Sequence, residues 1–403
     1  MAERQPALPD KIRDHAVALL TELCTISSSS GEAEGLRRMC ERLSVELARR
    51  GLAVETVEEP DITGALQPVL LARGPAAKES HLLLVGHMDT VLEAAPPRRE
   101  GDRLWATGAL DMKGGLAAFL GALELLAARG QKPPADLLLV VVPDEEVGGV
   151  ISEHAIRRWA APARAILVIE PGESRGDAET LVAGRRGLSE WRLEASGKAA
   201  HSGLAYWQGR SALAAAADWA AQAQRLSERG PGVTVNVARL VGGDSDFVND
   251  LAHHHDLLGT ARRRNVIPDR AVGEGEVRFL APAEGARILG RLEQLTATVA
   301  AAYQVPMSFL RGATVPPVDP HGPGAALVQR AVELAAARGW RLEVEEDRGG
   351  ISFPNYVPDP SRVPIVDGLG PVGDGMHTRQ EYVSLLSLER RVVLLADLLA
   401  SLA

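Results

Sequence analysis

Between residues 68 and 169 the chain alternates between short apolar runs and longer helical segments. The predicted strands and helices are Pro68–Arg73, Leu82–Val85, helix 113–129, Leu137–Val142, helix 151–159 and Ala165–Ile169. Such alternation is typical of βαβ units, in which helices cover a mostly parallel sheet. The sequence therefore predicts an α/β domain, with two further helices within residues 10–51.

A different pattern begins near Gly187 and interrupts this domain. It predicts a strand at Leu188–Ala195, a helix at 209–228, strands at Val233–Leu240 and Gly273–Leu280, and a helix at 284–302. This β-α-β-β-α order indicates a ferredoxin-like α+β module. A chain of 403 residues is also longer than the ~250–300 that a single core supports. We expect one domain of residues 1–186 and 313–403, with residues 187–312 inserted.

Composition excludes several classes of function. The net charge of −9 disfavours a nucleic-acid or anionic-membrane partner, because either would require a basic face. The apolar runs all fall short of the ~18 residues of a membrane span. The first residues lack the pattern of a secretory signal, which favours a cytoplasmic protein. Cys24 and Cys40 lie in helical stretches and are expected to be buried free thiols.

Polar side chains follow directly on the predicted strands. His87 follows the strand at 82–85, Glu145 and Glu146 follow the strand at 137–142, and Glu170 follows the strand at 165–169. In open α/β sheets, ligands bind beyond the carboxyl ends of the strands. We therefore expect these four side chains to converge on one site.

Together with Asp111 and His377, this set meets the needs of two zinc ions. Catalytic zinc takes nitrogen and oxygen ligands and keeps one position for water. His87 and His377 would supply one histidine to each ion, and Glu146 and Glu170 the terminal carboxylates. Asp111 remains as the bridge, and a shared hydroxide completes both coordination shells. Co²⁺ or Mn²⁺ could substitute, because the same ligands accept several divalent ions.

Two further acidic residues have predicted roles beside the ions. Asp89 lies two residues after His87, on the same face of an extended strand, and could accept the second imidazole N–H. Glu145 and Glu146 are neighbours, so their side chains point in opposite directions. While Glu146 binds metal, Glu145 would serve as general base and later as the acid that protonates the leaving nitrogen.

Each motif taken alone has an ordinary interpretation. A His-x-Asp pair is most often a polar loop, and adjacent glutamates are most often a solvated turn. The glycines at 108–115 fit a plain strand-to-helix turn, because no Gly-Lys-Ser/Thr ending follows them. Coincidence of all the motifs at strand ends favours a single metal site.

These residues lie in motifs that resemble those of a known family. The chain is similar to the two-zinc aminoacylases and carboxypeptidases, which include glutamate carboxypeptidase, acetylornithine deacetylase and succinyl-diaminopimelate desuccinylase. The shared motifs are G-H-M-D-T-V, L-D-M-K-G-G, D-E-E-V-G-G, E-P-G, G-K-A-A-H-S-G, R-N-V-I-P and L-G-P-V-G-D-G-M-H. The resemblance implies that Asp111 is the bridging ligand, that Glu145 is the general base and that Asp89 orients His87. It also implies a cis peptide bond after Asp111.

For the inserted domain, the resemblance implies a lid that forms a homodimer. His201 would then reach the substrate carbonyl from the neighbouring subunit. Asn265 and Arg278 would hold a substrate carboxylate, for which the planar arginine fork is well suited. Read without the family, a lone histidine is usually structural or solvated, and an arginine on a strand is usually a surface charge.

Glutamate rather than aspartate at position 170 resembles the carboxypeptidases and N-acyl amino acid deacylases. The Gly349-Gly350 loop looks closest to the glutamate carboxypeptidase branch. Three departures from the family concern specificity: the extra stretch 244–261 with its three consecutive histidines, the bulky Phe353-Pro354, and Asp374 with Met376 near His377. A metal site at the three histidines is less favoured than a solvated loop.

We expect a homodimeric di-zinc metallo-carboxypeptidase that cleaves the amide bond of a C-terminal amino acid, with a small amide or dipeptide as substrate. An N-acyl amino acid or diamine deacylase, or an amidase for a specialised small molecule, would use the same ligands. A catalytically inactive metal-binding scaffold is disfavoured because Glu145 accompanies the full ligand set.

Overall fold

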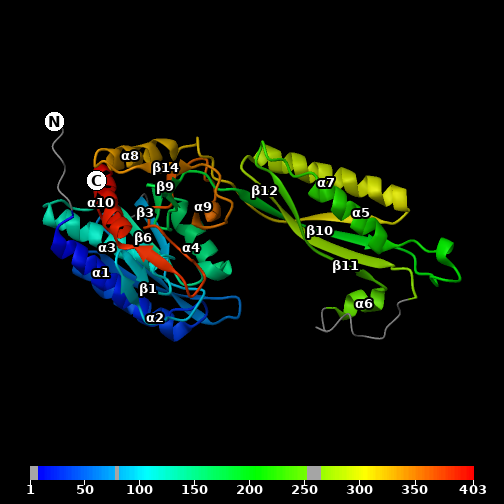
Figure 1. The fold of residues 1–403 in the computed structure, drawn as a ribbon, viewed down its shortest axis with the longest axis horizontal. Coiled ribbons are helices and arrows are strands. Elements are labelled where there is room, and N and C mark those ends of the chain that lie inside the picture. The colour runs from blue at the N-terminus through cyan, green and yellow to red at the C-terminus, as the bar shows by residue number, and fades with distance from the viewer. Residues whose placement is uncertain (1–7, 78–80, 252–264) are drawn as a thin grey trace. The chain divides into compact units, whose positions relative to one another are not determined.

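The computed structural model describes residues 8–77, 81–251 and 265–403, which fall into two compact units (Figure 1). The first unit comprises the described parts of Met1–Arg185 and Val318–Ala403, and the second those of Arg186–Pro317. Each unit has its own cluster of buried apolar side chains. The last strand of the second unit, β13, runs from Met307 to Val315 and so extends past residue 312.

The first unit contains the elements on either side of the insertion. Before it come α1 (Asp10–Thr25), α2 (Ala33–Arg49), β1 (Ala53–Pro60), β2 (Leu66–Arg73), β3 (His81–His87), β4 (Arg98–Glu100), β5 (Arg103–Trp105), α3 (Lys113–Ala128), β6 (Leu137–Val142), η1 (Glu145–Val147), α4 (Val150–Ala160), β7 (Ala163–Val168), β8 (Ser174–Arg175) and β9 (Ala178–Val182). After it come α8 (Ala325–Ala336), β14 (Leu342–Glu345), α9 (Phe353–Tyr356), β15 (Ile365–Val366), β16 (Gly373–Asp374), β17 (Tyr382–Ser384) and α10 (Leu385–Ser401).

The central sheet of this unit has the strand order β1-β2-β6-β3-β7-β15. Strands β6, β3, β7 and β15 are parallel, whereas β2 is antiparallel to both β1 and β6. Every residue of β3 and β6 is buried. Continuous burial of this kind is expected for parallel strands that helices cover on both faces. The exposed edge strand β1 carries three glutamates and was not predicted from the sequence.

Chain direction explains how the helices cover both faces. The connection through α3 leads from β3 to β6, and the connection through α4 leads back across β3 to β7. Right-handed crossovers in opposite directions place α3 and α4 on opposite faces of the sheet. Helices α1 and α10 pack against α3, and α4 packs against β6 and β7 (Figure 1). Because β3, β6 and β7 are parallel, their carboxyl ends lie at the same edge of the sheet.

The second unit contains β10 (Gly187–Ser196), η2 (Tyr206–Gln208), α5 (Ala212–Gln224), β11 (Thr234–Gly243), α6 (Ser245–Asp250), β12 (Arg270–Phe279), α7 (Pro282–Tyr303) and β13. Its antiparallel sheet has the order β11-β12-β10-β13, and α5 and α7 pack on it and on each other. Trp219 of α5 donates a hydrogen bond to Thr296 of α7 at 2.9 Å. This is a ferredoxin-like arrangement.

The predicted fold class is thus confirmed: a mostly parallel α/β sheet flanked by helices, with an inserted ferredoxin-like α+β module. Two small sheets complete the first unit, in the orders β16-β17-β5-β4 and β14-β9-β8. Cys24 and Cys40 are buried free thiols. Among the described residues, no helix combines the length and the apolarity that a membrane crossing requires.

Candidate metal centre

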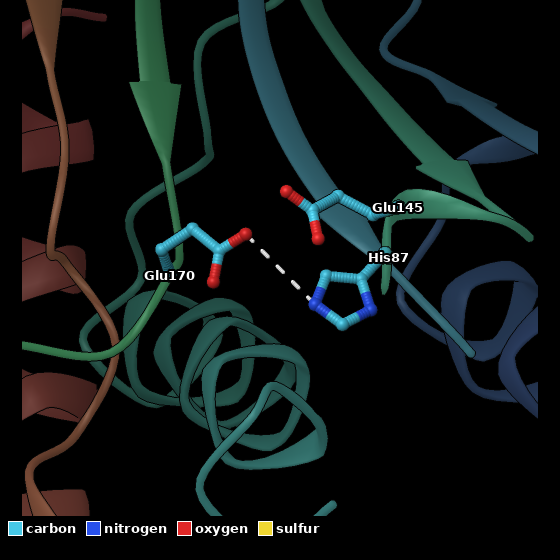
Figure 2. Close-up of side chains that lie close together, drawn as sticks. All are labelled: His87, Glu145 and Glu170. Carbon is cyan, nitrogen blue, oxygen red and sulfur yellow. Dashed lines mark ion pairs between the residues drawn. The ribbon is translucent and has the colours of Figure 1, made fainter. Parts of the chain in front are cut away.

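Three neighbouring parallel strands deliver the central side chains of the site. His87 is the last residue of β3, Glu145 and Glu146 form the η1 turn just after β6, and Glu170 lies two residues beyond β7. Figure 2 shows His87, Glu145 and Glu170 facing one another, with an ion pair between His87 and Glu170. Strand ends therefore bring together residues that are up to 83 positions apart in the sequence (170 − 87).

Asp111 lies between the two histidines and presents one oxygen to each. His87 Nε2 is 3.2 Å from Asp111 Oδ1 and 3.8 Å from Glu170 Oε1. His377 Nε2 is 3.3 Å from Asp111 Oδ2 and 3.0 Å from Glu146 Oε2. We call His87, Glu170 and Asp111 Oδ1 the His87 subsite, and His377, Glu146 and Asp111 Oδ2 the His377 subsite.

Donor atoms of these side chains are close enough to share a metal ion. Ligand atoms of His87, Asp111 and Glu146 all lie within 4.8 Å of one another. Those of His87, Glu145 and Glu170 do so as well. Glu145, predicted as a base, therefore lies next to the candidate ligands.

Asp89 connects the end of β3 to the η1 turn. His87 Nδ1 lies 3.1 Å from the backbone oxygen of Asp89 and 3.2 Å from its carboxylate Oδ1. The same carboxylate accepts the backbone N–H groups of Glu145 at 3.2 Å and Glu146 at 3.1 Å, and the hydroxyl of Ser30 at 2.7 Å. Asp89 thus orients the imidazole through its backbone and carboxylate oxygens, and its buried carboxylate fixes the turn that carries both glutamates.

The loop that carries Asp111 is tightly packed. The Asp111–Met112 peptide bond is cis, as the family resemblance implied. At the start of α3, a Cβ on Gly115 would lie 2.1 Å from the backbone oxygen of Ile169. Glycine at this position allows the helix to approach the end of β7, beside Glu170.

Crowding of the carboxylates changes the pKa values of the site. Burial and the nearby Asp111 raise the pKa of Glu146 to about 8, and they raise the pKa of Glu170 well above its usual range. Burial also raises the pKa of Glu145. For Asp111, burial acts in the opposite direction to the hydrogen bonds from His377 and His87, which lower its pKa.

The two histidines respond to the same negative charge. Hydrogen bonding to Asp111 raises the pKa of His377 to about 9, although partial burial opposes this shift. Burial would lower the pKa of His87, but hydrogen bonds to Asp111 and Asp89 raise it well above 6.5. The site therefore favours positive charge at its centre.

The loop after Gly349-Gly350 lies beside the His87 subsite. Ser352 Oγ is 3.3 Å from Glu170 Oε1, and Ser352 forms a capping box with Asn355 at the start of α9. Phe353 is buried, with its ring centroid 6.2 Å from that of His87. Gly350 accepts a hydrogen bond from Arg185 through its backbone oxygen at 2.9 Å.

The remaining predicted site residues belong to the second unit. His201 is exposed, and its Nε2 is 3.3 Å from the side-chain nitrogen of Asn265. A β-bridge between His201 and Val266 holds these two segments together. Arg278 lies on β12 and donates to Glu276 at 2.8 Å. His253, His254 and His255, in the stretch 244–261, lie outside the described residues, as does most of that stretch beyond α6.

Sequence reasoning missed three residues that support the site. They are Ser30, which bonds to Asp89; Ser352, which bonds to Glu170; and Glu381, which accepts hydrogen bonds from the backbone of the Asp111 loop. Ser30 and Ser352 are small polar residues in loops and carry little signal alone. A signal for Glu381 does exist, because it lies four residues after His377.

Comparison with known proteins agrees with this architecture. The chain is 29% identical over 393 residues to carboxypeptidase G2 of Pseudomonas sp. (strain RS-16), a match that covers 96% of this chain and 89% of the relative. Among solved structures, aminopeptidase PepT from Bacillus cereus has a TM-score of 0.77 at 20% identity, over 96% of this chain and 99% of that one.

The Bacillus subtilis YXEP protein, described as a dinuclear metal binding peptidase from the M20 family, has a TM-score of 0.68 at 15% identity. That match covers 98% of this chain and 99% of the other. At such identities these two structures show the fold. The family model for peptidase family M20/M25/M40 matches residues 83–401, which include every candidate ligand. The chain is therefore a member of peptidase family M20/M25/M40 and a metallo-hydrolase of the peptidase type.

Proposed function

We propose that this protein is a two-zinc carboxypeptidase that cleaves the amide bond before a C-terminal amino acid. The observation that carries the proposal is Asp111, whose two oxygens face two different histidines, each with its own terminal glutamate. Carboxypeptidase G2, which the chain resembles over most of its length, supports the direction of cleavage.

The donor set supports a pair of divalent cations. Two imidazoles and three carboxylates are hard or borderline ligands that suit zinc. The dinuclear metal binding of the related YXEP protein is consistent with this assignment. Without cations, crowded carboxylates are costly to ionise, as the raised pKa values of Glu146 and Glu170 indicate. Two bound cations would offset that cost.

When bound, such a metal pair would lower the pKa of a coordinated water and polarise the scissile carbonyl. Glu145 accepts the proton of the attacking water, because its carboxylate lies within 4.8 Å of donor atoms in the His87 subsite. Its raised pKa suits both accepting that proton and returning it to the leaving nitrogen. Asp89 keeps His87 in the required tautomer and holds the Glu145 turn in place.

The second unit would act as the lid and as the contact between two subunits. His201 would donate to the carbonyl oxygen from the neighbouring subunit, and its proximity to Asn265 supports their joint action on one substrate. Arg278 would bind the substrate α-carboxylate. Gly349 and Gly350 would form the wall of the pocket on the first unit.

A panel of substrates tests the proposal. The purified protein, loaded with Zn²⁺ or with Co²⁺, should hydrolyse acyl-glutamates or dipeptides with a free α-carboxylate and should leave their amidated counterparts intact. Exclusive hydrolysis of N-acetyl or N-succinyl amino acids or diamines would instead establish the deacylase alternative. A chain that binds fewer than two metal ions by elemental analysis would contradict the two-metal site.

A further inference from the structure

Glu381 is a buried carboxylate with an unusual set of partners. Its Oε2 accepts the backbone N–H of Gly108 at 2.8 Å, and its Oε1 accepts those of Leu110 at 2.8 Å and Asp111 at 3.0 Å. Only 5% of Glu381 is exposed. All three donors belong to the loop that carries Asp111, so a single side chain fixes the backbone of that loop.

The same residue belongs to the turn that carries His377. Residues 375–381 connect β16 to β17, and backbone bonds from Thr378 to Gly375 and from Glu381 to Thr378 close the turn. His377 itself has a φ of 64°. Glu381 immediately precedes β17, whose Tyr382 pairs with Trp105 of β5. Its backbone oxygen also accepts the N–H of Ala106 at 3.2 Å.

Glu381 therefore connects two ligands that come from distant parts of the chain. His377 and Asp111 come from different connections, whereas His87 ends β3 and Glu170 lies just after β7, the adjacent strand of the central sheet. Moreover, His377 is the more exposed histidine, since its side chain is 53% exposed whereas that of His87 is buried. The His377 subsite thus needs a separate connection between its turn and the Asp111 loop.

We propose that Glu381 is a positioning residue that affects the metal affinity of the His377 subsite more strongly than that of the His87 subsite. This inference rests on the proposed two-metal function. Loss of a residue that orients a metal ligand weakens metal binding by roughly 10–100-fold. Glu381 holds both His377 and the shared Asp111, whereas His87 and Glu170 are held by the central sheet. The larger loss should therefore fall on the ion of the His377 subsite.

Glutamine is the most informative substitution at this position. Glu381→Gln has nearly the same volume, but one of its two terminal atoms becomes an NH₂ group, which cannot accept a hydrogen bond. Either Gly108, or Leu110 together with Asp111, then faces a donor. Glu381→Asp keeps the charge and both acceptors on a shorter side chain, so it should retain part of the function and should fold if the glutamine variant does not.

The experiment is a zinc titration of the chelator-treated full chain by calorimetry, with elemental analysis of the bound metal. Wild type should bind two Zn²⁺. In Glu381→Gln we expect one of the two affinities to fall roughly 10–100-fold while the other falls by a smaller factor. In a His377→Ala background, the same substitution should lower the affinity of the single remaining zinc less than it lowers that of the His377 subsite in the otherwise wild-type chain.

Glu46→Gln is the matched control, because Glu46 is also a buried carboxylate with several partners but lies in α2, away from the site. It should destabilise the fold without separating the two zinc affinities. If Glu381→Gln lowers both affinities equally, or neither, the inference is wrong. If Glu381→Gln does not fold, the same titration is carried out on Glu381→Asp. An unequal loss of the two zinc affinities supports the inference, and an equal loss or none contradicts it. A wild-type chain that binds fewer than two Zn²⁺ overturns the proposed function, and the inference with it.

Discussion

Neighbouring glutamates at the end of β6 have different roles in the proposed reaction, and single substitutions should separate them. Glu146 contacts His377 at 3.0 Å, whereas Glu145 is the proposed proton acceptor. We expect Glu145→Ala to keep both metal ions and to lose turnover by roughly 10²–10⁴-fold, the usual contribution of a general base. Metal analysis beside steady-state kinetics checks this. Turnover like that of wild type would exclude Glu145 as the base.

Glu46 provides a pH-dependent test of stability at a single residue. It bonds Arg42 at 2.7 Å and also pairs with Arg50. Burial opposes ionisation, but these arginines prevail and lower the pKa of Glu46 from 4.5 to about 2. Because the pKa is lower in the folded state, the stabilisation is fully present above pH 4.5 and is lost as the pH falls toward 2.

Glu46→Gln should therefore lower the free energy of unfolding by about 3 kcal/mol at pH 7. Denaturant unfolding at several pH values measures the difference between wild type and variant. That difference should be constant above pH 5 and should shrink toward pH 3. A difference that grows in acid would contradict the assigned direction of the pKa shift.

At the level of elements, the approach of α3 to the end of β7 depends on Gly115. A Cβ there would meet the backbone oxygen of Ile169 at 2.1 Å, so the helix and the strand would have to separate. We expect Gly115→Ala to reduce the free energy of unfolding by about 1–3 kcal/mol. It should also weaken zinc binding, because Glu170 follows Ile169 directly.

Gly290 in α7 is the control with the opposite sign. A Cβ at Gly290 has nothing within 4 Å, so Gly290→Ala should stabilise the helix by about 0.5–1 kcal/mol. Denaturant unfolding of both variants makes the comparison. Equal effects of the two substitutions would show that backbone propensity, rather than the contact with β7, dominates at Gly115.

The individual strands also show how much of the structure could be predicted from the sequence. The apolar runs that became β3, β6 and β7 are continuous and short, and polar residues follow each of them at once. The end of a strand and a candidate site residue can therefore be recognised together in the sequence. The edge strand β1 lacks such a run, and β13 is largely exposed, so neither has the apolar signal of a buried strand. The hydrogen bonds that Glu381 accepts join residues about 270 positions apart, and the position of Glu381 four residues after His377 does not identify those partners.

At the scale of the whole molecule, the strongest prediction concerns the proposed dimer. His201 and Glu145 belong to different units of the chain. If His201 acts on the neighbouring subunit, a mixed dimer of His201→Ala with Glu145→Ala contains one site with both residues intact and one with neither. If it acts within its own chain, both sites of the mixed dimer lack one of the residues.

Equal mixing of the two inactive variants produces mixed dimers as about half of the population. Activity should therefore return to about a quarter of the wild-type value, since one site works in half of the dimers. Subunits that carry two different affinity tags allow the mixed dimer to be purified and its exchange to be verified. A purified mixed dimer with no activity would place His201 in its own chain's site, and that result would remove the main reason for a shared active site.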